Sequence, residues 1–173
     1  LRAGNLKLRS GEAQAADEFS RTEGGFSRFN FDVNHVSKLS KVTQFYIFAH
    51  GQLANRNLDS SEQFYLGGAD AVRAYPQGEA GGDSGYQATA ELRYQTPVKG
   101  MSMTLFADVG EVLARKDGDT SDPHRRLAGW GIGAVYSLDR SLYARLDYAR
   151  KIKGESYRSE AEDKNGRLWF RLY

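Results

Sequence analysis

The chain has 173 residues, and its 24 basic and 22 acidic side chains leave a formal net charge of only +2. This small positive excess does not by itself indicate a nucleic-acid partner. Cysteine is absent, which excludes disulfides and thiolate metal sites. No apolar run approaches the ~18 residues of a membrane-spanning helix. Frequent glycine and aromatic residues with scarce proline are typical of long antiparallel strands.

Alternation of apolar and polar residues predicts strands along most of the chain. The clearest stretch, 84–96, sets polar residues against one apolar column, namely Tyr86, Ala88, Ala90, Leu92 and Tyr94. Eight segments follow this pattern: 2–9, 25–37, 41–52, 84–96, 101–113, 125–137, 141–152 and 166–173. Most reach the ~9–11 residues that a transmembrane β-strand needs.

The predicted connections between these segments alternate in length. The short ones are 38–40, 97–100 and 138–140, and the long polar ones are 10–24, 53–83, 114–124 and 153–165. Bacterial outer-membrane barrels have tight periplasmic turns and long external loops in this same alternation. The sequence therefore predicts an all-β fold, an antiparallel transmembrane β-barrel whose final strand ends in the periplasm.

The two faces of the predicted strands differ in chemistry. The apolar face carries aromatic side chains near its ends, as an interfacial girdle does: Tyr86, Tyr94, Tyr136 and Tyr148. The opposite face would line a wet lumen with Arg28, Asp32, Glu91, Arg93, Arg145 and Asp147. A soluble β-sandwich binding module would also alternate, with the apolar face as its core. Strands this long exceed the usual ~5–6 residues of soluble sheets, which favours the barrel.

The long connection 53–83 carries the main candidate site. A connection of about 30 residues is uncommon without a function. Its run Val72-Arg73-Ala74-Tyr75 places a cation between apolar and aromatic neighbours. Strand phase points Asp108 to the polar face, so an inward-folded connection would let Arg73 form a charge-assisted hydrogen bond with it. Glu91 is a second possible partner, and the alternative is that Arg73 is a solvated loop charge.

Glycines at alternate positions of segment 125–137 form an inward column: Gly129, Gly131 and Gly133. Two interpretations remain open at this point. The glycines either weaken packing within the strand or leave room for the 53–83 connection to press against the wall.

No pattern indicates a metal, a cofactor or an enzyme. The three histidines, His35, His50 and His124, lack metal-ligand spacing. The acidic stretch 117–122 lacks the ligand spacing of a calcium-binding loop and is expected to be a solvated external loop. No nucleophile-elbow motif frames a serine, so we expect no hydrolase.

A family resemblance follows from four stretches and one later motif. The stretches are Asn57–Gly68, Val72–Tyr75, Gly82–Tyr86 and Glu91–Tyr94, and the motif Phe-x-Asp-x-Gly is Phe106, Asp108 and Gly110. Together they resemble the C-terminal barrel region of two-partner secretion transporters, the hemolysin- and hemagglutinin-secreting outer-membrane proteins of the wider assembly-factor superfamily. The loop tip matches at Val72, Arg73 and Tyr75, whereas Ala74 stands where the family usually has glycine.

The resemblance implies that residues 1–173 are the C-terminal half of a barrel of about sixteen strands in the bacterial outer membrane. It implies secretion of an unfolded partner exoprotein through a pore, with no nucleic acid, and contacts to outer-membrane lipid. The first half of the barrel and the periplasmic domains would lie outside this chain. Since an open half-barrel leaves unpaired edges in lipid, we expect a fragment, or completion by another chain or copy. An outer-membrane protein assembly or insertion factor is the alternative within the superfamily.

Overall fold

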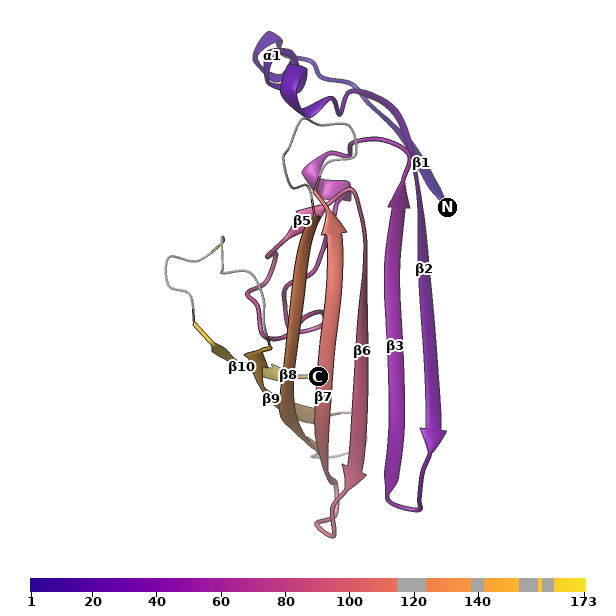
Figure 1. Cartoon of the computed structure of the whole chain (residues 1–173), viewed down its shortest axis with the longest axis vertical. Coiled ribbons are helices and arrows are strands. Elements are labelled where there is room, and N and C mark those ends of the chain that lie inside the picture. The colour runs from indigo at the N-terminus through magenta and orange to yellow at the C-terminus, as the bar shows by residue number, and fades with distance from the viewer. Residues whose placement is uncertain (115–123, 138–141, 153–158, 160–163) are drawn as a thin grey trace.

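The computed structural model describes residues 1–114, 124–137, 142–152, 159 and 164–173. Its main feature is one antiparallel sheet with the strand order β1-β2-β3-β6-β7-β8-β9-β10 (Figure 1). The strands are β1 (Arg2–Leu6), β2 (Gly24–Lys38), β3 (Thr43–Ala54), β6 (Ser84–Gln95), β7 (Met101–Leu113), β8 (His124–Ser137), β9 (Tyr143–Lys151) and β10 (Gly166–Leu172). The other elements are α1 (Gly11–Ser20), the 3-10 helix η1 (Ser60–Glu62) and a small hairpin of β4 (Phe64–Tyr65) and β5 (Gly81–Gly82).

All eight predicted strand segments are strands of this sheet, each paired with its sequence neighbour or across the 53–83 connection. The first is shorter than predicted because β1 ends at Leu6. The short turns after β2 and β6 are confirmed at one end of the sheet (Figure 1). The predicted turn 138–140 lies outside the described residues, as does the acidic stretch 117–122. These eight strands form one sheet and not the two packed layers of a β-sandwich.

The connection 10–24 contains a helix that the sequence analysis did not assign. Ser10 is its N-cap, and its side chain accepts a hydrogen bond from the Ala13 amide. Arg21 ends it in the left-handed conformation with φ of 51°. The cap residue followed by good helix formers was the available signal, and period-2 alternation does not indicate a helix. Within the described ranges, no helix is long and apolar enough to span a bilayer.

The described strands separate the two kinds of side chain as predicted. Along β7, buried and exposed residues alternate, with Met103, Leu105 and Val109 exposed and Phe106 and Asp108 buried. The aromatic residues of the predicted girdle are all exposed on the apolar face: Tyr86, Tyr94, Tyr136 and Tyr148. An outward face of exposed apolar side chains is what an antiparallel sheet presents to lipid.

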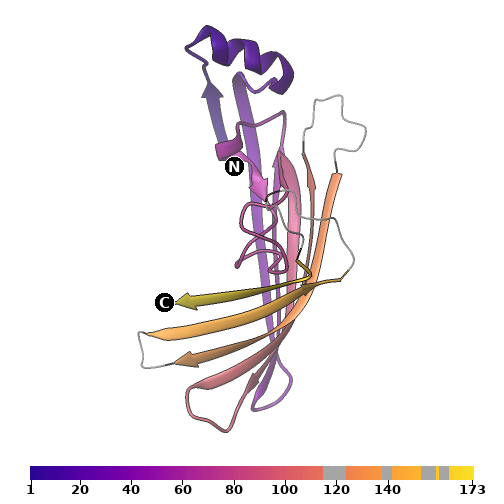
Figure 2. The same ribbon diagram turned by 90° about the vertical axis from the view of Figure 1, so that its left-hand side faces the viewer.

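The sheet is curved, and its concave side is occupied by the 53–83 connection, which we call the inward loop (Figure 2). The buried apolar cluster lies between this loop and the strands. Its members are Phe64, Leu66, Val72, Ala74, Tyr75 and Ala80 from the loop, with Phe106, Val112, Leu127 and Ala149 from the wall. The core of the described chain is therefore the contact between the inward loop and the sheet.

The carboxylate of Asp17 closes the end of α1. It accepts hydrogen bonds from the hydroxyl and amide of Thr22, from the Ser20 hydroxyl and from the Glu23 amide. The Thr22 hydroxyl is the largest cause that holds the pKa of Asp17 well below its ordinary value. A carboxylate with a lowered pKa stabilises the folded state above its unfolded pKa of about 3.9, and this stabilisation is lost as the pH falls toward the folded pKa.

We therefore expect the 10–24 segment to loosen as the pH falls from about 4, near the unfolded pKa of Asp17, to about 2. The measurement is pepsin cleavage within this segment of the intact membrane protein as a function of pH. Asp17→Asn should be as sensitive at pH 4 as the parent is at pH 2. Equal resistance of parent and variant throughout would contradict the role of this carboxylate.

A charge on the outward face should disturb insertion. Leu105→Arg, in the middle of β7, should lower the free energy of unfolding of the lipid-embedded barrel by about 2–4 kcal/mol. The control is Val98→Arg in the turn after β6, where the same charge near the interface should cost about 0–1 kcal/mol. Urea titrations of both variants in lipid vesicles check this, and equal effects at the two positions would overturn the assignment of the lipid face.

Candidate functional site

The tip of the inward loop is folded tightly by its own backbone. Leu66 accepts a hydrogen bond from the amide of Val72 at 2.8 Å, and Val72 accepts one from the amide of Tyr75 at 3.1 Å. Gly68 has φ of 133°, a conformation that side-chain-bearing residues rarely adopt. These bonds shape the backbone around Arg73, whose side chain reaches the sheet.

The Arg73 guanidinium binds two carboxylates of the wall. Its Nε and Nη2 donate to the two oxygens of Asp108 at 2.9 and 2.7 Å, and its Nη1 donates to Glu91 at 2.9 Å. The side chains of all three residues are at most 4% exposed. Asp108 also accepts from the Arg73 amide at 3.1 Å and from the Thr89 hydroxyl at 2.9 Å. The structure thus forms the Arg73–Asp108 pair and adds the Glu91 contact.

The three residues of the Phe-x-Asp-x-Gly motif on β7 contact the inward loop in different ways. The ring of Phe106 lies under the guanidinium, with its centroid 3.3 Å from Arg73 Cζ. Asp108 supplies the bidentate carboxylate. A Cβ on Gly110 would lie 2.5 Å from a methyl carbon of Leu66, so this glycine leaves room for the loop. Period-2 spacing places all three on the concave face.

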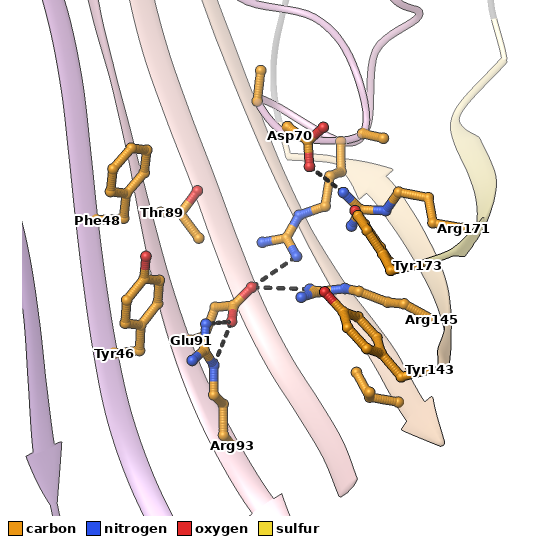
Figure 3. A pocket seen from close by; sticks show the side chains of 14 residues that line it. Tyr46, Phe48, Asp70, Thr89, Glu91, Arg93, Tyr143, Arg145, Arg171 and Tyr173 are labelled. Atoms are coloured by element: carbon orange, nitrogen blue, oxygen red, sulfur yellow. Dashed lines mark hydrogen bonds and ion pairs between the residues drawn. The ribbon is translucent and has the colours of Figure 1, made fainter. Parts of the chain in front are cut away.

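The secondary lumen candidates form a network around Glu91. This carboxylate accepts from Arg93 Nε at 2.7 Å and from Arg145 Nη2 at 3.1 Å (Figure 3). Arg145 Nε in turn donates to Asp147 at 2.7 Å. Asp147 is fully buried and lies 3.9 Å from Arg73 Nη1. Glu91 and Asp147 therefore each contact more than one arginine, which compensates the desolvation of both kinds of charge.

Two residues of β10 complete this network and were not among the sequence-predicted site residues. Trp169 Nε1 donates to the carbonyl oxygen of Arg73 at 2.7 Å. Arg171 donates to Asp147 at 2.9 Å and pairs with Asp70 at the loop tip. Alternation placed both on the inward face, and that was the available signal. Their contact with the tip depends on sheet curvature, which the alternation does not encode.

A second anchor holds the returning arm of the inward loop. The buried carboxylate of Glu79 pairs with Arg125 of β8 at 2.7 Å. It also accepts from the hydroxyl and amide of Ser159 at 2.6 and 3.0 Å. Glu79 lies in an irregular stretch without periodicity, so no sequence pattern pointed to this contact.

The glycine column of β8 faces the inward loop and the residues that hold it. A Cβ on Gly129 would lie 2.6 Å from the Cβ of Ala74, so this position makes room for the tip. A Cβ on either of the next two glycines would meet a buried site side chain, Phe106 for Gly131 and Asp147 for Gly133. The second interpretation of the column, room for the loop, is confirmed at Gly129.

A cavity of about 340 Å³ lies below the tip. Aromatic and arginine side chains line it, including Tyr46, Arg93, Tyr143, Arg171 and Tyr173 (Figure 3). Each arginine of the lining is already paired with a carboxylate. Among the described residues, no group of three or more histidine, cysteine, aspartate or glutamate side chains is arranged to hold a metal ion.

Comparison with known proteins identifies the family. The description "Haemolysin secretion/activation protein ShlB/FhaC/HecB" matches residues 5–136. The chain belongs to this family. Its members are outer-membrane transporters of Gram-negative bacteria, which places this all-β chain in the outer membrane and confirms the resemblance found in the sequence.

Individual relatives agree with this assignment. The chain is 32% identical over 111 residues to the Heme/hemopexin transporter protein HuxB of two Haemophilus influenzae strains, covering 62% of this chain and 20% of each relative. It thus spans about a fifth of the length of the curated relatives it matches. The solved structure of CdiB from Acinetobacter baumannii superposes with a TM-score of 0.62 at 18% identity, over 88% of this chain and 28% of that chain, and shares the fold.

The close approach of Ala74 to Gly129 is testable, because it depends on the absence of a side chain at residue 129. Gly129→Ala should push Ala74 off the wall, and hydrogen–deuterium exchange of residues 69–75 should become faster in the membrane-inserted protein. Adding Ala74→Gly removes the opposing methyl group and should restore slow exchange. Unchanged exchange in the single variant, or no recovery in the double variant, would contradict this packing.

Proposed function

We propose that residues 1–173 form the C-terminal half of the barrel of a two-partner secretion transporter. This transporter passes an unfolded partner exoprotein outward across the outer membrane. Family membership supports the class of activity. The match covers about a fifth of the curated relatives, and the N-terminal half of the barrel and the periplasmic domains lie in the rest of such proteins. The short turns of the sheet face the periplasm, and the long connections face the outside.

The observation that carries the proposal is the inward loop. It enters from the end of the long connections and is fixed against the concave face, where the barrel lumen lies (Figure 2). The ion pair of Arg73 with Asp108 and Glu91 sets its position. A loop in the lumen controls passage of a chain through it, and the polar wall residues keep the lumen hydrated. The proposed activity moves a polypeptide without bond chemistry and assigns no residue a catalytic role.

Arg73→Ala should impair secretion while the barrel still inserts. Removing Arg73 leaves the buried carboxylate of Asp108 without its guanidinium partner, whereas Glu91 keeps Arg93 and Arg145. Breaking a buried ion pair in this way costs about 3–5 kcal/mol of stability. This is enough to release the tip and lower export by at least about tenfold. The control is Arg126→Ala, which removes an arginine whose side chain is 76% exposed. Normal export by Arg73→Ala would overturn the role of the loop.

The activity itself is tested with the full-length protein in proteoliposomes. An unfolded candidate exoprotein, encoded beside the transporter gene, is added outside the vesicles together with protease. Protection of the exoprotein inside the vesicles supports secretion. Continued exposure of the exoprotein, while added barrel precursors insert into the same vesicles, would replace secretion with the assembly-factor alternative.

A further inference from the structure

Strand β10 contacts the loop tip through Trp169 and Arg171, in addition to the pair of Arg73 and Asp108. The peptide of Arg73 is held on both sides by side chains of the wall. Its amide donates to Asp108 on β7, and its carbonyl accepts from Trp169 on β10. Two strands, β8 and β9, separate β7 from β10 in the sheet. The tip therefore bridges strands that are not neighbours.

Arg171 adds a second bridge from the same strand. Its guanidinium pairs with Asp70 at the tip and donates to Asp147 on β9 at 2.9 Å. The Arg171 side chain is 16% exposed and Asp147 is fully buried, whereas Asp70 is 85% exposed. Arg171 thus links an exposed carboxylate of the loop to a buried one of the wall.

The geometry of β10 allows both contacts because its side chains alternate. Trp169 and Arg171 are two residues apart and share the concave face. Leu168, Phe170 and Leu172 point to the opposite side and are all exposed. The curvature of the sheet brings β9 and β10 across the end of the inward loop (Figure 2). One strand therefore faces lipid on one side and holds the loop on the other.

We propose that β10 positions the loop tip through Trp169 and Arg171, so the tip is fully fixed only when the last strand is docked on β9. Trp169 and Arg171 act as positioning residues, since they hold the Arg73 carbonyl and the Asp70 carboxylate of the tip and do not replace the ion pair of Arg73. This deepens the proposed function, because it names the strand that sets the resting position of the loop in the secretion pore.

The test measures the position of the tip without secretion. Val72→Cys places a thiol at a fully buried site of the tip, and the absence of other cysteines in residues 1–173 keeps the label specific. Any cysteine elsewhere in the full-length protein is replaced by serine. The rate of reaction with a soluble maleimide, in membranes without exoprotein, then reports how often the tip leaves the wall.

Trp169→Phe keeps an aromatic ring but loses the N–H donor, and it should raise the labelling rate about fivefold, as expected for one lost hydrogen bond. Arg171→Gln should also raise it, and Phe170→Leu on the lipid face should not. Heat-modifiable electrophoretic migration verifies that each variant is inserted and folded. The expected change is about fivefold. The proposal would be overturned if both Trp169→Phe and Arg171→Gln were labelled at about the parent rate, within roughly twofold. If Trp169→Phe prevents insertion, the Arg171→Gln rate alone decides.

The outcome is independent of whether the protein secretes an exoprotein. Faster labelling together with failed protease protection in proteoliposomes would support β10 as the positioning strand and reject the secretion activity. Unchanged labelling together with normal protection would reject the β10 contacts and leave secretion standing.

Discussion

The rest of this structure depends on the buried ion pairs that the Arg73 guanidinium forms with Asp108 and Glu91. A cation removed from water is stable only where several acceptors surround it. Asp108 and Glu91 meet this requirement from two neighbouring strands, and Phe106 supplies an aromatic face below the charge. The loop reaches this position because the wall opposite it has glycine at Gly110 and Gly129. The carboxylates and the glycines of the wall thus favour the same position for the tip.

This arrangement explains why strands in a membrane barrel carry so many ionisable residues. Each strand meets lipid on one face and the inward loop on the other, so period-2 alternation gives each face the side chains that its surroundings require. The carboxylates and arginines of the concave face neutralise one another around the loop. Glu91 and Asp147 each contact more than one arginine. The apolar core lies between loop and sheet, so the loop is part of the fold and not an appendage.

The fold was largely predictable, whereas the site was predictable only in its centre. Alternation and connection length located every long strand, and strand phase put Asp108 and Glu91 where Arg73 reaches them. Trp169 and Arg171 had the right phase, but nothing local brought them to the tip. Arg125 shares the inward phase of the glycine column in segment 125–137, but its partner Glu79 had no periodic signal. The helix α1 was missed because its cap at Ser10 lies in a segment treated as a connection. Short-range patterns encode which way a side chain points, and distant contacts depend on the curvature that the whole sheet adopts.

The sequence by itself determined the class of fold, the lipid-facing and inward-facing columns, and the pairing of a loop arginine with an aspartate of the wall. These follow from steric and solvation rules that act between residues one or two positions apart. The tertiary structure decided how the loop is held as a whole. It joined Arg73 to Trp169 across the intervening strands, Glu79 to Arg125 on the wall, and Ala74 to the space over Gly129. Such contacts arise only when a curved sheet packs against a folded loop, because no local pattern specifies the distance between residues so far apart in the chain.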